Sequence, residues 1–120
     1  MCEIKKLYFE ESQETIDSIR KSLEKLLKHQ NDIYSLNKLL NGTHTLCGNS
    51  FQMGFNKIGK LAELVLGFFS GIENGEKKLT EKEFRVLKQA IDALEEAIKS
   101  KKIGKKCQIE ETLFKKIKVL

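Results

Sequence analysis

Apolar residues recur every three or four positions along most of this chain, which is the period of an amphipathic α-helix. A first helix is predicted over about 4–29, and the break at 30–32 ends on Asp32, a residue type that caps helices well. Its predicted buried side consists of Phe9, Ile16, Ile19, Leu23, Leu26 and Leu27. A second helix is predicted over about 33–53, with a narrower and partly polar inward side. That side consists of Leu36, Leu39, Leu40, Thr43, Leu46, Ser50 and Met53.

Three more helical segments follow the second one. Gly54 is predicted to end the second helix, and a third spans about 56–72 before an Asn-Gly turn at 74–75. Thr80 and Glu83 have the spacing of a capping box, in which each side chain bonds the other's backbone amide at the start of a helix. The fourth helix then runs to about residue 99, and a short fifth one spans about 109–119. The predicted buried side of the third helix consists of Ile58, Leu61, Ala62, Val65 and Phe68 or Phe69, and that of the fourth consists of Phe84, Leu87, Ile91, Leu94 and Ile98.

These segments predict an all-α fold. Four amphipathic helices with short connections bury their apolar sides most simply as an antiparallel four-helix bundle. The short additional C-terminal helix would pack on its side or protrude. We therefore expect residues 1–100 to form the bundle and residues 101–120 to form a basic C-terminal extension that carries the fifth helix. The absence of proline agrees with long helices.

Composition narrows the possible functions. The chain has 120 residues, enough for one domain, and no apolar run approaches the roughly 18–20 residues of a membrane span. Its start lacks the features of a secretory signal, and Cys2, Cys47 and Cys107 lack metal-ligand spacing, so we expect reduced thiols and a cytoplasmic location. The net charge of +5 comes largely from lysines after residue 99. Without a recognised motif or interleaved aromatic residues, these do not favour nucleic-acid binding.

The second helix contains an anomaly around His44. Gly42 and Gly48 each cost roughly 1 kcal/mol relative to alanine inside a helix, which suggests a role other than stability. At about 100° per residue, His44 lies about 120° from the centre of the buried side, at the solvent boundary. The residues predicted beside it are Asn37, Leu40, Cys47, Gly48 and Phe51. We interpret this as an exposed imidazole in a docking patch, whereas His29 at a helix end is interpreted as a solvated side chain.

Several segments resemble histidine-containing phosphotransfer domains, most closely the amino-terminal domain of CheA-type chemotaxis kinases. The resemblance covers roughly residues 7–99. It is carried by His44-Thr45-Leu46-Cys47-Gly48-Asn49-Ser50, by Met53-Gly54-Phe55, by Tyr8-Phe9-Glu10-Glu11-Ser12 and by the turn Asn74-Gly75-Glu76. The family's corresponding segments are His-x-x-Lys-Gly-Ser/Asn and a trailing Met-Gly-Phe.

The resemblance implies a phosphate carrier in two-component or chemotaxis signalling. His44 would accept a phosphoryl group from the ATP-binding domain of a histidine kinase and pass it to an aspartate of a response-regulator receiver domain. The partners would bind ATP and Mg²⁺, so no cofactor or metal is expected in this domain. Gly48 would let the partner approach, and Leu40 and Phe51 would line the contact. The chain would then not be an enzyme on its own, whether it is a separate carrier or part of a kinase.

Two departures from the family's pattern bear on this expectation. The lysine three residues after the histidine is Cys47 here, and a thiol cannot supply its positive charge to a phosphate. The glutamate that orients the imidazole in related kinases, about 22 residues after the histidine, is Leu66 here. We hypothesise that Glu63, one helical turn earlier, accepts the imidazole N–H instead, and that Lys57 or Lys60 approaches the phosphate.

These departures leave an alternative open, in which a degenerate bundle docks a receiver or kinase domain without carrying phosphate. His44 and Gly48 favour the carrier, whereas Cys47 and Leu66 favour the docking module. Redox sensing by Cys47 is disfavoured, because a mid-helix thiol beside a neutral imidazole lacks the positive surroundings that lower a thiol pKa.

Overall fold

Each segment that the apolar period assigns to a helix is helical in a computed structural model, which describes residues 3–106 and 108–120. In these residues the helices are α1 (Glu3–Lys28), α2 (Ile33–Gln52), α3 (Asn56–Glu73), α4 (Glu81–Lys102) and α5 (Glu111–Lys118). Predicted and observed bounds differ by at most three residues, the scatter expected at frayed helix ends. The all-α prediction is therefore confirmed.

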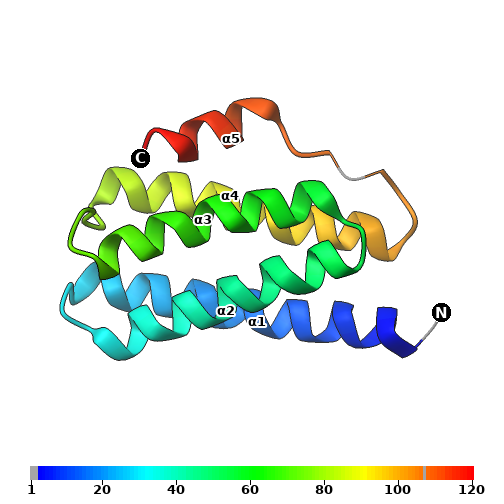
Figure 1. Cartoon of the computed structure of the whole chain (residues 1–120), viewed down its shortest axis with the longest axis horizontal. Helices are drawn as coiled ribbons and strands as arrows, with labels where there is room; N and C mark the ends of the chain where they lie inside the picture. Colours follow the sequence, from blue (N-terminus) through cyan, green and yellow to red (C-terminus); the bar gives the residue numbers. More distant parts are fainter. Residues whose placement is uncertain (1–2, 107) are drawn as a thin grey trace.

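The first four helices form an antiparallel bundle with α1 diagonal to α3 (Figure 1). Contacts join α1 to α2, α2 to α3, α3 to α4, and α4 back to α1. Helix α5 returns along α3 and α4 and packs against both, so it does not protrude. The Nζ atom of Lys77, from the α3–α4 connection, donates a hydrogen bond of 2.8 Å to the backbone oxygen of Leu120 and ties the chain's end to the bundle. This arrangement leaves one face of α2 without a covering helix.

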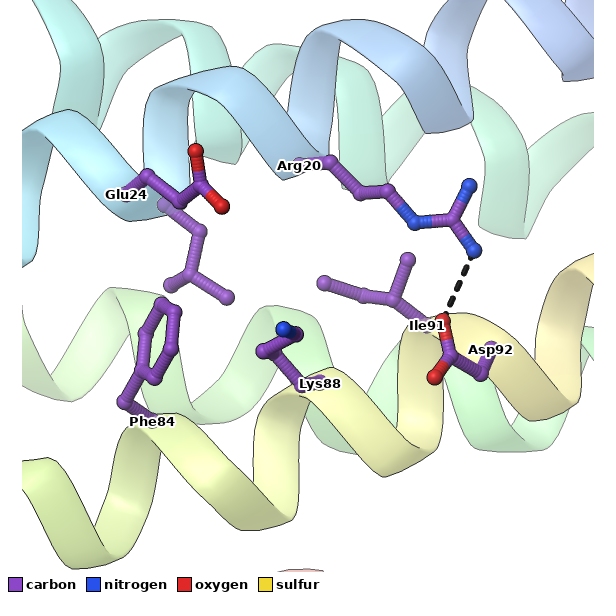
Figure 2. A pocket seen from close by; sticks show the side chains of 7 residues that line it. Arg20, Glu24, Phe84, Lys88, Ile91 and Asp92 are labelled. Carbon is purple, nitrogen blue, oxygen red and sulfur yellow. Dashed lines mark hydrogen bonds and ion pairs between the residues drawn. The ribbon is translucent and has the colours of Figure 1, made fainter.

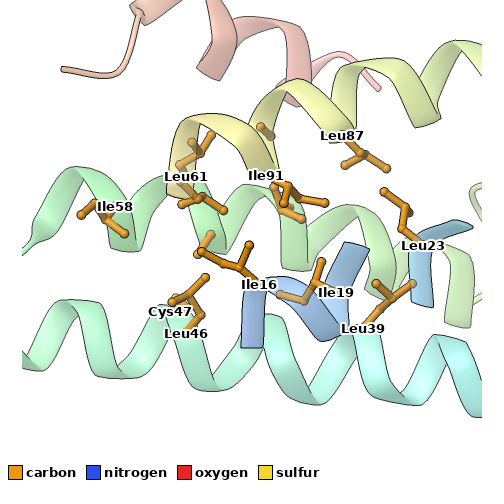
Figure 3. Close-up of a cluster of buried hydrophobic side chains, with 14 of the residues drawn as sticks. Ile16, Ile19, Leu23, Leu39, Leu46, Cys47, Ile58, Leu61, Leu87 and Ile91 are labelled. Atoms are coloured by element: carbon orange, nitrogen blue, oxygen red, sulfur yellow. The ribbon is translucent and has the colours of Figure 1, made fainter. Parts of the chain in front are cut away.

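The core lies between the four long helices (Figure 3). Most residues of the predicted buried sides are fully buried, including Ile16, Leu39, Leu61 and Leu87. The edges of these sides are only half-buried, namely Leu27, Leu36, Leu40, Met53 and Phe84. The apolar period thus identified the core. The half-buried residues lie where the buried face of each helix borders its solvent-exposed face.

The polar residues on the inward side of α2 all have hydrogen-bond partners. Thr43 donates to the backbone oxygen of Leu39 (2.6 Å), and the Ser50 hydroxyl lies 2.9 Å from the hydroxyl of Tyr8. Because buried polar groups are costly without partners, these bonds let a partly polar stripe pack against the core. The contact between Tyr8 and Ser50 also joins α1 to α2 near the end of α2.

Helix ends follow the predicted signals at two connections. The carboxylate of Asp32 accepts hydrogen bonds from the backbone N–H and the hydroxyl of Ser35, which caps α2. These two bonds lower the pKa of Asp32. Gly54 and Gly75, after α2 and α3, have φ of +79° and +80°, which glycine adopts without strain.

The predicted capping box at the start of α4 is wrong. Thr80 is the N-cap residue with an extended backbone, but its side chain makes no capping hydrogen bond. The Oε2 atom of Glu83 is buried and has no hydrogen-bond partner among the described residues. The start of α4 is instead positioned by Leu79, which is buried and whose carbonyl accepts a 2.9 Å hydrogen bond from Gln30. Tertiary contacts here replace the local cap.

A polar cluster joins α1 to α4 on the side away from the α2–α3 pair. Arg20 donates a hydrogen bond of 2.8 Å to Asp92 (Figure 2). It also donates hydrogen bonds of 2.9 Å to both carboxylate oxygens of Glu95. Gln13 adds a fourth bond, 2.8 Å to Glu95. The bonds from Arg20, followed by the bond from Gln13, lower the pKa of Glu95 from 4.5 to about 2. The cluster therefore stabilises the bundle while Glu95 is ionised.

Glu95→Gln is expected to lower the free energy of unfolding at pH 7 by about 1–2 kcal/mol, the range for a partly exposed charged hydrogen-bonded pair. The folded-state pKa is depressed, so this stabilisation is present above pH 4.5 and is lost as the pH falls towards 2. Urea unfolding at pH 7, 4.5 and 3 should show the difference from wild type shrinking. Glu96→Gln, an exposed neighbour on α4, is the control and should have little effect. A constant difference over this pH range would contradict the assignment.

Candidate functional site

The site is built on the outer face of α2. The side chain of His44 is exposed, as predicted, while Thr43, one residue before it, and Leu46, two residues after it, are buried. Within residues 3–106 and 108–120, no hydrogen bond or ion pair involves the His44 ring. The backbone of His44 is therefore fixed within α2, while its imidazole is open to solvent. Such a group is available as a nucleophile or as a ligand to a partner's atoms.

Gly48 leaves space one turn after His44. A Cβ atom built on Gly48 would meet no atom within 4 Å, so the backbone of α2 is open to solvent on this side. Phe51 lies one turn further and is 37% exposed, and Leu40, one turn before His44, is half-buried. The predicted docking residues thus share the accessible side of α2 with His44. A partner surface can approach the backbone here more closely than at any residue with a side chain.

The aromatic ring of Phe51 is held in place by α3. A Cβ atom on Gly59 would lie 2.9 Å from three atoms of the ring, so the ring packs directly on the backbone of α3 at a residue without a side chain. Gly59 is not among the residues that the sequence predicted to take part in the site. A glycine inside a helix predicted to be well packed was the available signal, but it could not show which aromatic side chain uses the space.

Cys47 faces the bundle rather than the docking surface. Its side chain is 9% exposed, and its Sγ atom donates to the backbone oxygen of Gly59 at 3.5 Å. Burial, and secondly the charge of Glu63, raise the pKa of the thiol. A raised pKa keeps the sulfur protonated and unreactive, which supports the structural interpretation of this thiol. Cys2 and Cys107 lie outside the described residues.

The packing of α2 on α3 places the residues that depart from the family's pattern. Cys47 and Phe51 both meet Gly59, and the two helices are antiparallel, so His44 is level with residues 62–66 of α3. Leu66 is half-buried at this level, and Glu63 is exposed. No hydrogen bond joins Glu63 to His44 in the part of the chain that the structure describes. Lys57 and Lys60 are also exposed and lie nearer the level of Gly48 and Phe51.

The described residues contain no group of three or more His, Cys, Asp or Glu side chains placed to hold a metal ion. They also contain no helix with the length and apolar character needed to cross a membrane. What the surface of α2 offers chemically is one accessible imidazole, an open backbone beside it and two apolar contacts.

Comparisons with known proteins agree on one family. Residues 3–97 match the Hpt domain family. The chain is 28% identical over 94 residues to the chemotaxis protein CheA of Bacillus subtilis, an alignment that covers 78% of this chain and 14% of that protein. It therefore spans a small part of the length of this relative. Its fold is similar to that of the phosphorylated P1 domain of CheA3 from R. sphaeroides, solved in complex with CheY6. The TM-score is 0.85 at 20% identity, and the match covers 99% of this chain and 95% of that one.

Proposed function

Because this chain belongs to the Hpt domain family, we propose that it carries a phosphoryl group on His44 between a histidine kinase and a receiver domain. The observation that carries the proposal is the exposed imidazole beside the open backbone of Gly48. The other histidine, His29, follows the end of α1 and has no glycine within four residues of it. Under this proposal the chain is a substrate and carrier, and the catalytic groups belong to its partners.

The chemistry is two in-line transfers. In the first, a ring nitrogen of His44 attacks the γ-phosphorus of ATP bound to the kinase, the N–P bond forms, and the bond to the ADP oxygen breaks. In the second, a receiver carboxylate oxygen attacks the same phosphorus, and the N–P bond breaks to return the free imidazole. Positioning and neutralisation of charge dominate such transfers. A rigid helix contributes the positioning, and the Mg²⁺ that neutralises charge is bound by the partner.

The surface around His44 suits a partner that must bring its own reacting group close. Gly48 leaves room for the rim of a receiver's active site, and the apolar side chains of Leu40 and Phe51 flank that gap. The P1 domain of CheA3, which shares this fold, was solved bound to a receiver protein, CheY6. We propose that a receiver domain binds this chain on the outer face of α2, where His44 and Gly48 lie.

This proposal assigns different roles to the bundle and to the C-terminal extension. Residues 1–100 would contain all the groups needed for transfer, and residues 101–120 would form a basic extension that is dispensable for it. Cys47 would act as a packing residue of α2, and the family's lysine at that position would have no direct substitute. Lys60, level with Gly48, is the nearest candidate for contact with the phosphate.

Glu63 is proposed to orient the ring of His44 when a partner is bound. Its carboxylate acts electrostatically on Cys47, one turn from His44, and it lies on the level of that histidine on α3. Glu63→Gln is expected to slow phosphorylation of His44 about tenfold, because a carboxylate on one ring nitrogen makes the other more nucleophilic. The initial rate of label incorporation measures this, with Glu73→Gln at the end of α3 as the control. Equal rates for the two variants would exclude the orienting role.

Label transfer tests the function itself. The domain is incubated with the ATP-binding domains of CheA-type kinases and radiolabelled ATP, and the product is treated with acid or alkali. We expect label that is lost in acid and retained in alkali, as for phosphohistidine, and that moves to a receiver domain on mixing. Amide shifts of the ¹⁵N-labelled domain on adding receiver should be largest at Leu40, Gly48 and Phe51.

The alternative function, docking without transfer, is favoured by the loss of the family's lysine and glutamate at Cys47 and Leu66. It makes a different prediction in the same experiment. Receiver binding would be seen at the outer face of α2, but no label would be incorporated with any of several competent kinase domains.

A further inference from the structure

A pocket lies at the end of the bundle where the chain passes from α2 to α3 and where α4 ends. It has a volume of about 450 Å³, within the roughly 300–1,000 Å³ of small-molecule sites. Its lining residues are Gly54, Phe55, Asn56, Lys57, Ile58, Lys101, Lys106 and Gln108. None of them is acidic and three are lysines. The pocket therefore has a positive potential that no lining carboxylate offsets.

The three lysines come from different parts of the chain and converge by folding. Lys57 is in the first turn of α3, Lys101 is near the end of α4, and Lys106 is in the connection to α5. Lys101 is held at the pocket by Phe55, because its Nζ atom lies 5.4 Å from the centre of that ring. None of these lysines forms an ion pair within residues 3–106 and 108–120, where Arg20 supplies the salt bridges. Like charges gathered without a counter-charge repel one another, so an anion would relieve this repulsion.

The backbone at the same place adds hydrogen-bond donors. The first backbone bond of α3 runs from the Gly59 N–H to the Phe55 oxygen (3.0 Å), so the N–H groups of residues 56–58 precede the helix's own ladder. Phe55, at the N-cap, makes no side-chain hydrogen bond to them. These donors complement the lysines, which remain the main source of positive charge.

We propose that this pocket binds the polyphosphate group of a small molecule, either inorganic di- or triphosphate or the phosphates of a nucleotide. The charge of such an anion is similar in size to the three lysine charges, and the pocket is larger than a single phosphate needs. The pocket lies past the end of α2, at the α2–α3 connection, the start of α3, the end of α4 and the α4–α5 connection, and neither His44 nor Gly48 lines it. The inference therefore stands whether or not His44 carries phosphate.

Titration of the ¹⁵N-labelled chain with sodium triphosphate tests the proposal, at an ionic strength kept constant with NaCl. We expect saturable shifts of the amides of Asn56, Lys57 and Ile58. The triple variant Lys57→Gln/Lys101→Gln/Lys106→Gln should bind about tenfold or more weakly, since each exposed ion pair contributes modestly. The matched control, Lys115→Gln/Lys116→Gln/Lys118→Gln, removes the same charge from α5 and should change the Kd by less than about twofold.

The outcomes separate the pocket from general attraction to a basic protein. Equal weakening in both triple variants, or shifts that do not saturate, would reduce the effect to net charge and overturn the proposal. Absence of shifts at residues 56–58 would overturn it as well. ADP in a second titration distinguishes the two sources of phosphate: tighter binding than inorganic diphosphate identifies a nucleotide site, and equal binding identifies the phosphates alone as the ligand. Circular dichroism of each variant confirms that the helices are intact.

Discussion

His44→Gln is expected to abolish incorporation of phosphoryl label while leaving the fold unchanged. Glutamine has no ring nitrogen that can attack phosphorus, so the covalent step has no nucleophile. The His44 side chain is exposed and has no hydrogen bond among the described residues, so its replacement removes no packing or polar contact. We expect a free energy of unfolding within about 0.5 kcal/mol of wild type, as for most surface substitutions. Label incorporation and urea unfolding measured on the same samples check both parts.

His29→Gln is the matched control for this prediction. His29 is the chain's other histidine and is also exposed, so the same chemical change is made at a site without an adjoining open backbone. We expect full labelling of this variant. Label retained in His44→Gln and lost in His29→Gln would place the phosphoryl group on His29 and overturn the proposal. Label retained in both variants would exclude phosphohistidine as the sole labelled species at either position.

Phe69→Ala is expected to have the largest effect on stability, a loss of about 3–5 kcal/mol in the free energy of unfolding. Phe69 is fully buried in α3, and its ring packs edge-on against Phe68, with 6.3 Å between centroids. Truncation leaves a cavity in a close-packed core, where the surrounding helices cannot fully collapse. For a domain with a total stability of about 5–15 kcal/mol, this loss is a large fraction. Urea unfolding followed by circular dichroism measures it.

Phe51→Ala provides the same change of residue at the surface of α2. Its ring is 37% exposed and contacts the backbone at Gly59, so the expected loss of stability is smaller, roughly 1–2 kcal/mol. Under the proposed function this variant should instead bind a receiver domain more weakly. Similar losses of stability in the two variants would contradict the burial of Phe69 in the core between the four long helices.

The apolar period predicted the helices and the core well because burial is encoded in local spacing. A residue's angle on a helix follows from its number, so the exposure of His44 and the burial of Leu39 and Leu61 could both be read from position. The same reasoning placed Cys47 beside His44 on the solvent boundary, whereas it is buried against Gly59. The angular position of Cys47 on α2 could not predict its burial, because the burial of a residue at the edge of a helix face depends on how closely the neighbouring helix approaches.

Capping motifs predicted the contacts at helix ends less reliably than the apolar period predicted the helices. Thr80 and Glu83 have the spacing of a capping box but do not form one, since the start of α4 is positioned by buried Leu79 and by Gln30 from the α1–α2 connection. Asp32 caps α2 as expected, because its partner Ser35 lies on the same turn and no distant contact competes. A capping motif therefore forms its expected hydrogen bonds where no tertiary contact takes over the positioning of the helix end.

The sequence by itself determined that the chain is an all-α bundle and that His44 stands on an exposed helix face next to a missing side chain. These properties depend on residue spacing within single helices. The tertiary structure alone decided which residues meet across helices: Phe51 on Gly59, Arg20 with Glu95, and three lysines around one pocket. Spacing along a chain cannot set these contacts, because they depend on the register and separation of helices packed as a whole.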